Sequence, residues 1–215
     1  MIHNRNFFLL CWFLLCLAYV GNIKAAPAPV AEHVIKSGFP QEADMLAEMT
    51  QSLFKEYKAN DNPLSLVFYA YGTLRQADRA LQTNDFIRAS EYGKTGFFYL
   101  DEAVDLYEDN MLVRYMRARV DAWLPASIGR CVVTLKDTEQ MLNTPDVFNA
   151  GLVEHINEMR YRALLSCKHK RQADALLAEI ELRNANTASS LASGSAPEWD
   201  INEVTEILLP LAKGK

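Results

Sequence analysis

Apolar side chains recur every three or four residues along most of this chain, a spacing typical of amphipathic helices. Strand-like alternation is nearly absent, although the β-branched run at 130–135 could locally favour a strand. Pro63, Pro125 and Pro145 interrupt the pattern, since proline is tolerated only in the first turn of a helix. The sequence therefore predicts an all-α protein. The expected helices lie at about 40–59, 63–82, 85–108, 111–124, 127–142, 145–169 and 171–183.

The first 25 residues have the order of a secretory signal peptide. Arg5 precedes an apolar run at 7–20, and small residues and prolines follow it. The run has 14 residues, whereas about 20 are needed to span a bilayer. We therefore expect cleavage after Ala25, with retention as a membrane anchor as the alternative. Residues 26–39 are expected to form an extended N-terminal segment before a helical domain at 40–183.

The charge of the chain narrows the classes of function. The formal net charge is −5, and loss of Arg5 and Lys24 with the signal peptide brings it to −7. An acidic surface is unsuited to nucleic-acid phosphates, so no nucleic-acid partner is expected. No asparagine begins an N-x-Ser/Thr sequon, which favours a bacterial source. We expect an exported protein, periplasmic or secreted, without a membrane partner after cleavage.

The C-terminal region contains a predicted linker and a last helix. Residues 184–197 are rich in Ala, Ser and Asn and carry no charge, a composition typical of a flexible linker. Ser195 and Glu198 match a capping box that would begin an amphipathic helix at 198–212. This helix would either fold back to close the end of the last helix pair or dock on a partner or an identical chain. Its apolar stripe comprises Trp199, Ile201, Val204, Ile207, Leu208 and Leu211.

Small residues recur at corresponding places in the predicted helices. Ala77, Ala118 and Ala163 lie near the centres of the second, fourth and sixth helices, 41 and 45 residues apart. Ala89 and Ala175 follow the first and last of these by 12 residues, which would place small residues where paired helices cross. Over residues 63–183 this arrangement resembles the tetratricopeptide repeat, with units longer than the usual 34 residues.

The resemblance implies an α-solenoid, an array of antiparallel helical hairpins. Gly93 and Gly96 lie inside a helix and would permit the close backbone packing of such an array. In these arrays the first helix of each hairpin lines a concave surface that binds extended peptides or helices of other proteins.

Arginines interleaved with aromatic residues occupy the expected first helices, and this composition is typical of binding hot spots. We therefore expect a concave, basic and aromatic groove for an acidic peptide or protein, while acids gather at 101–109 on another helix. The alternative is that the arginines are solvated and the aromatic residues belong to the core. The candidate partner-binding residues are Arg75, Arg114, Tyr115, Arg117, Arg119, Trp123, Asn157, Arg160 and Lys168.

Residues suited to catalysis or metal binding are scarce. His155 lies near Glu154 and Glu158, but no second histidine follows at helical spacing, so an exposed pair of His155 with Glu158 is expected. No glycine-rich phosphate loop or nucleophile elbow occurs. We therefore expect neither enzymatic activity nor a cofactor or metal.

Cys131 and Cys167 are the cysteines that remain after cleavage, and export to an oxidising compartment favours their pairing. Two straight helices joined by a turn near Thr144 would leave them about 15 Å apart in height, too far for a disulfide. The mismatch shrinks where residues 147–151 are partly loop. A disulfide and two separate buried thiols both remain open.

These features predict an exported, non-catalytic helical-repeat module that mediates protein–protein interaction in the cell envelope or outside the cell, as a scaffold does. A homo-oligomer formed through the C-terminal helix is compatible with this function. The alternative is a periplasmic protein that binds a small molecule or assists a solute transporter, which an enclosed apolar cavity would favour.

Overall fold

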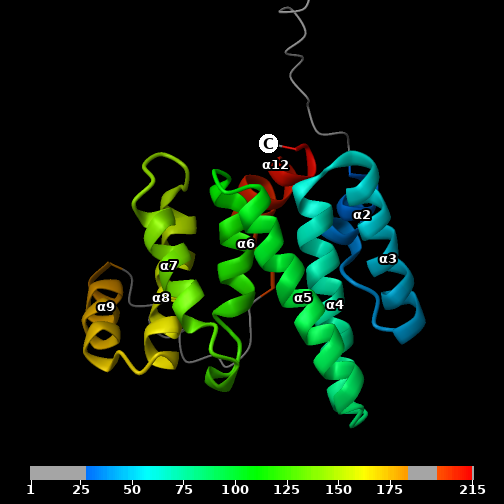
Figure 1. The fold of residues 1–215 in the computed structure, drawn as a ribbon. Coiled ribbons are helices and arrows are strands. Elements are labelled where there is room, and N and C mark those ends of the chain that lie inside the picture. The colour runs from blue at the N-terminus through cyan, green and yellow to red at the C-terminus, as the bar shows by residue number, and fades with distance from the viewer. Residues whose placement is uncertain (1–27, 184–197, 215) are drawn as a thin grey trace, which may run out of the picture.

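The computed structural model describes residues 28–183 and 198–214, which contain helices and turns but no strand. Neighbouring helices pack against each other in chain order, so that the array extends from α3 at one side to α9 at the other (Figure 1). The all-α prediction is confirmed, and the packed helix pairs are compatible with a helical repeat. The helices of the array are α2 (Pro29–Ser37), α3 (Ala43–Asn60), α4 (Pro63–Gln82), α5 (Phe86–Leu106), α6 (Met111–Asp121), α7 (Cys131–Leu142), α8 (Ala150–Ser166) and α9 (Lys170–Arg183).

A short 3-10 turn and a last helical stretch complete the described chain. A 3-10 turn, η2 (Ala126–Ile128), precedes α7. Beyond residue 197, α11 (Ile201–Glu203), the π-helical turn η3 (Val204–Leu208) and α12 (Leu209–Ala212) follow without interruption. The signal peptide expected at 1–25 and the linker expected at 184–197 lie outside the described residues. Within the described ranges, no helix has both the length and the hydropathy needed to cross a membrane.

Local capping explains where several helices begin. The Asn62 side chain accepts hydrogen bonds from the backbone N–H groups of Leu64 (3.0 Å) and Ser65 (3.2 Å), and Pro63 occupies the first helical position. The predicted range of 63–82 is therefore confirmed. The start expected at Thr144-Pro145 is wrong, because Asn149 caps α8 instead and the helix begins at Ala150.

The N-terminal segment expected to be extended instead forms α2, which corrects the prediction for residues 29–37. No side chain next to α2 caps it. Instead the Glu56 carboxylate of α3 accepts hydrogen bonds from the backbone N–H groups of Val30 (2.7 Å) and Ala31 (3.1 Å). A cap supplied from 25 residues away leaves no local signal, because an N-terminal cap is normally read from adjacent residues.

The α4–α5 pair shows the close packing expected at one of the two glycines. A Cβ atom on Gly96 would lie 2.7 Å from Cγ of Leu74 and 3.2 Å from the carbonyl oxygen of Ala70, so the helices approach closely there. A Cβ atom on Gly93 would meet nothing within 4 Å, so the expectation of close packing at Gly93 is wrong.

The alanines of the proposed repeat are buried with one exception. Ala175 is exposed, and Ala173 is the buried alanine of α9. The buried members of the predicted set are Ala77, Ala89, Ala118 and Ala163. One contiguous hydrophobic core runs from α2 to α8 and includes side chains from η3 and α12.

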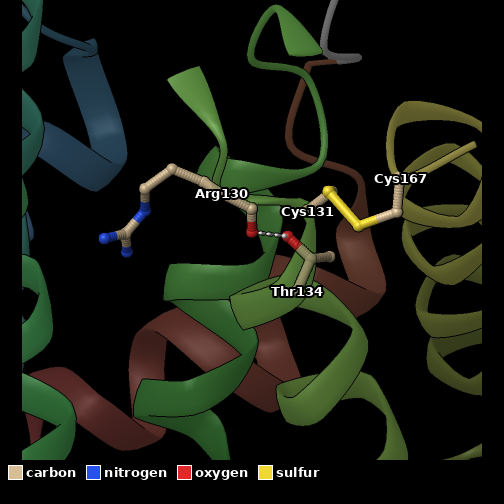
Figure 2. Close-up of a disulfide and its surroundings, with 4 residues drawn as sticks. All are labelled: Arg130, Cys131, Thr134 and Cys167. Atoms are coloured by element: carbon tan, nitrogen blue, oxygen red, sulfur yellow. Dashed lines mark hydrogen bonds between the residues drawn. A yellow bond between two sulfur atoms is a disulfide. The ribbon is translucent and has the colours of Figure 1, made fainter. Parts of the chain in front are cut away.

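A disulfide joins α7 to the end of α8. Cys131 is the first residue of α7, Cys167 follows the last residue of α8, and their Cα atoms lie 5.6 Å apart (Figure 2). The two cysteines are level because residues 143–149 form a turn rather than a continuation of either helix. The possible pairing is thus confirmed, and such a bond fits an oxidising compartment. Thr134 donates to the Arg130 carbonyl oxygen one turn into α7 (Figure 2).

Candidate functional site

The helices of the described ranges form the pairs α2–α3, α4–α5, α6–α7 and α8–α9, and the first helices of these pairs carry the C-terminal segment, residues 198–214. The segment packs on α2, α4 and α8, and its polar side chains reach α6. It therefore folds back across the array from α8 to α2 instead of closing the end of the last pair at α9, because α12 lies beside α2 and α4, away from α9 (Figure 1). We call the surface beneath it the docking face, whose polar and aromatic contacts come from Asn62, Tyr71, Tyr115, Arg119 and His155.

A buried carboxylate anchors the middle of the C-terminal segment. Glu203 is 1% exposed, and its carboxylate accepts hydrogen bonds from Arg119 Nε (2.7 Å) and Nη2 (3.3 Å) and from Tyr115 Oη (2.8 Å). Burial, together with the charge of Glu203, raises the pKa of Tyr115, so its hydroxyl stays protonated and donates. A buried carboxylate with donors on both oxygens is a strong and geometrically specific contact.

The same carboxylate also begins the helix of the segment. Asp200 accepts a hydrogen bond from the Glu203 N–H (2.8 Å), and Glu203 Oε2 accepts one from the Asp200 N–H (3.2 Å), which is a capping box. The helix expected to begin at Glu198 therefore starts at Ile201 instead, whereas Ser195, the expected cap, lies outside the described residues. The Asp200 carboxylate lies 3.0 Å from Nε2 of His155 on α8.

An aromatic side chain covers the buried arginine. The Trp199 ring lies with its centroid 3.5 Å from Cζ of Arg119, a cation–π contact. Its other neighbour is Tyr71 of α4, with ring planes inclined by 12° and centroids 6.5 Å apart. Tyr71 in turn donates to the Met116 carbonyl oxygen (2.6 Å), and burial raises the pKa of its hydroxyl. Trp199 thus connects α4 and α6 through its ring.

Apolar side chains bury the rest of the segment. Ile207, Leu208, Leu211 and Ala212 are at most 1% exposed and belong to the core, whereas Ile201 is 72% exposed. The predicted stripe is therefore correct for its C-terminal half and wrong at Ile201. The π-helical turn at Val204–Leu208 separates these two parts, and such a turn changes the angular register of a helix.

Asn62 fixes the far end of the segment. Its Nδ2 donates to the carbonyl oxygens of Leu211 (3.3 Å) and Ala212 (3.0 Å), while its Oδ1 caps α4. One buried side chain thus satisfies the start of α4 and the end of α12 together.

Two of the predicted partner-binding arginines turn away from the docking face toward α7. Asp137, whose side chain is fully buried, accepts hydrogen bonds from Arg117 Nε (2.8 Å) and Nη2 (2.8 Å) and from Arg114 Nη1 (3.2 Å). Arg114 and Arg117 are only 9% and 7% exposed. Their guanidinium groups are therefore engaged inside the protein and do not line an exposed groove.

This charged cluster extends to α5 and to the start of α7. Arg130 donates to both oxygens of Asp101 (2.8 and 2.7 Å) and to Asp121 (2.9 Å), and Arg117 also reaches Asp101 (3.1 Å). Burial opposes ionisation of Asp101, but Arg130 and Arg117 outweigh it and lower its pKa. At Asp121 burial prevails and raises the pKa to about 6. Asp101, one of the acids at 101–109, thus links α5 to α6 and to the start of α7.

The other predicted residues are spread over the array. Tyr115 and Arg119 are the members of the set that contact the C-terminal segment, and both are buried. Trp123 is half-buried beneath the Arg162 guanidinium, and half-buried Arg160 donates to the Leu135 carbonyl oxygen (3.2 Å). The remaining members are buried Asn157 and exposed Arg75 and Lys168. An open groove lined by the whole set is therefore not formed.

Several residues of the docking face were missed by sequence reasoning. His155 pairs with Asp200, whereas its expected partner Glu158 pairs with Arg162 (3.2 Å). The D-x-x-E spacing of Asp200 and Glu203 is itself a capping signal that was available in the sequence. Its partners on α6 and α8 could be found only after the helices were packed.

A surface hollow of about 760 Å³, beside α5, α6 and Glu206, is open to solvent and carries the acids Glu108 and Asp109. In the described parts of the chain, no three His, Cys, Asp or Glu side chains are placed to hold a metal ion.

Comparison with known proteins does not identify a family: no protein-family model matches the chain, and no curated protein or solved structure matches it significantly.

Proposed function

We propose that the protein is an exported, non-catalytic helical-repeat module of the tetratricopeptide-like kind, which binds another protein at the docking face in exchange for its own C-terminal segment. The observation that carries this proposal is the buried Glu203 carboxylate between Arg119 and Tyr115. It supports a surface on the first helices that is shaped and charged to hold a helix, the mode that helical arrays use for their partners.

Export has two independent supports. The first is the basic, apolar and small-residue order of residues 1–25, which is typical of a signal peptide. The second is the disulfide between Cys131 and Cys167, since such bonds persist in the periplasm and outside the cell but rarely in a reducing cytosol. A solute-binding role has no comparable support, because the hollow of about 760 Å³ is open rather than enclosed.

A covalent lock on the C-terminal segment tests the proposal. A Cβ atom on Gly151 of α8 would lie 3.7 Å from Cγ of Asn202, so the two positions are neighbours, and thiol titration of a Gly151→Cys/Asn202→Cys variant shows whether the disulfide has formed. The Gly151→Ser/Asn202→Ser variant is the matched control, because it changes the same positions and cannot form the bond.

The measurement is cross-linking and mass spectrometry in the native cell envelope or secreted fraction. We expect the wild-type chain and the serine control to capture a common partner and the oxidised lock to lose it. Equal capture by the locked variant would exclude the docking face as the binding surface. Absence of any specific partner with all three chains would overturn the interaction function itself.

A further inference from the structure

We infer that the docking face takes one class of ligand, an acidic amphipathic helix of another protein with the pattern of residues 199–211. That pattern is an aromatic residue, Asp, two residues and Glu, followed by apolar residues at the spacing of Ile207, Leu208 and Leu211. This inference rests on the proposed function and adds the chemistry by which the partner is recognised.

The carboxylate site selects a Glu at one position of the ligand. Tyr115 is fully buried and Arg119 is 8% exposed, so the donors that face Glu203 are held inside the protein. A ligand with an apolar side chain there would leave the Tyr115 hydroxyl without its acceptor and would forfeit both hydrogen bonds from Arg119, whereas Gln would keep one acceptor oxygen and present an NH2 group to the Arg119 guanidinium. Buried polar groups that lose their partners discriminate strongly between otherwise similar ligands.

The acids that begin the ligand helix also contact the docking face. Asp200 caps the helix through the Glu203 N–H and at the same time lies 3.0 Å from His155. A ligand with both acids at this spacing therefore gains helix initiation and contact together. The aromatic residue before them completes the site, because Trp199 lies against both Arg119 and Tyr71.

The length of the ligand is set by two anchors at opposite ends of the docking face. Glu203 is held by α6, and the carbonyl oxygens of Leu211 and Ala212 are held by Asn62 at the start of α4. Between them Ile207 and Leu208 enter the core. A helix that ends early or shifts its register by one residue cannot satisfy both anchors.

The source of this helix is another protein rather than a second copy of the chain. A second copy would offer the same contacts that the attached segment already makes. The attached segment follows α9 after 14 residues on the same chain, which gives it an effective concentration on the order of millimolar. A second copy offers the same affinity and cannot reach that concentration, so it does not displace the attached segment. A partner helix with better contacts binds more tightly and can displace the segment at a lower concentration.

The test uses the full mature chain and a fluorescent peptide of residues 198–214. The attached segment competes with the peptide, so any weakening of the attached segment tightens peptide binding by the same factor. Asp200→Ala in the chain removes the helix cap and the contact with His155, and should tighten peptide binding about fivefold. Glu206→Ala is the matched control, since Glu206 is an exposed acid of the same segment, and it should leave the affinity unchanged.

The peptide itself supplies the second arm, measured by fluorescence anisotropy. A peptide carrying Glu203→Gln should bind the Asp200→Ala chain at least about tenfold more weakly than the unmodified peptide. Equal binding of the two peptides, or no binding at millimolar peptide, would overturn the inferred ligand class. A dimer of the Asp200→Ala chain that needs Glu203 would overturn the choice of another protein as the source. If any of these outcomes is found and the locked variant still loses its partner, the proposed function stands and only the class or source of the ligand is different.

Discussion

Replacing Arg117 with alanine tests whether Arg117 is a buried structural residue or an exposed residue that binds a partner. The Arg117 guanidinium supplies two of the three hydrogen bonds that Asp137 receives, both at 2.8 Å, and the Asp137 side chain is fully buried. Burial opposes the charge of Arg117, but its hydrogen bonds to Asp137 and the negative charge of that carboxylate outweigh burial and raise the pKa of Arg117. Arg117→Ala would therefore leave a buried carboxylate held by Arg114 alone, through one bond of 3.2 Å.

The expected loss follows from these contacts. Breaking a buried ion pair by removing one partner costs about 3–5 kcal/mol. Counting the hydrogen bonds instead gives a similar value, since two bonds to a charged group contribute about 1.5–3 kcal/mol each. We therefore expect Arg117→Ala to lower the free energy of unfolding by about 4 kcal/mol. Arg117→Lys keeps the charge but not the two-pronged geometry, and should lose about 2 kcal/mol.

Urea unfolding of the mature chain, followed by circular dichroism, measures these losses. Arg171→Ala on α9 is the matched control, because Arg171 is exposed and its loss should change the free energy by no more than about 0.5 kcal/mol. If Arg117→Ala fails to fold, the lysine variant provides the measurement. A change below about 1 kcal/mol in both Arg117 variants would show instead that Arg117 behaves as a solvated side chain.

Three further predictions follow from the packing, the disulfide and the buried acids. Gly96→Ala should lower the free energy of unfolding by about 1–3 kcal/mol because its Cβ meets α4, whereas Gly93→Ala, with open space, should raise it by up to about 1 kcal/mol; equal effects in urea unfolding would contradict this. Thiol titration of the denatured, unreduced mature chain should find no free thiol. The disulfide closes a separation of 36 residues and restricts the unfolded chain, so Cys131→Ala/Cys167→Ala should lower the free energy of unfolding by about 4 kcal/mol. The pKa of Asp121 is raised to about 6, so its protonated form favours the folded state. This contribution to stability is complete below about pH 4 and is lost as the pH rises through 6. Between pH 3.5 and pH 7 the free energy of unfolding of the wild-type chain should therefore fall by about 3 kcal/mol relative to that of Asp121→Asn. A difference between the two chains that does not change with pH would contradict the raised pKa.

Helix positions were predictable where the signal is local. The start of α4 depends on Asn62 and Pro63, which are adjacent in the chain, so the predicted range agrees with the structure. The start of α2 was not predictable, because its first N–H groups are satisfied by Glu56 of the next helix. Capping by a neighbour in sequence leaves a pattern, whereas capping by a neighbour in space does not.

The charged residues of the candidate site also show which features are predictable from the sequence and which depend on packing. The arginines of α6 were recognised as unusual, and Tyr115 and Arg119 do contact a helix, which is the chain's own. Their neighbours Arg114 and Arg117 point to Asp137 instead. Residues a few positions apart on one helix face different neighbours, so their roles depend on which helix packs on each side.

Periodicity and adjacent caps act within a few residues, so the all-α class, the α4 boundaries and an amphipathic C-terminal helix can be predicted without the packed fold. The place of that helix and the charges that it meets depend on contacts between distant segments. Glu203 reaches Arg119 across 84 positions, and the turn at 143–149 brings Cys131 level with Cys167. Such contacts depend on the relative placement of packed helices, which is a property of the whole core and not of any segment.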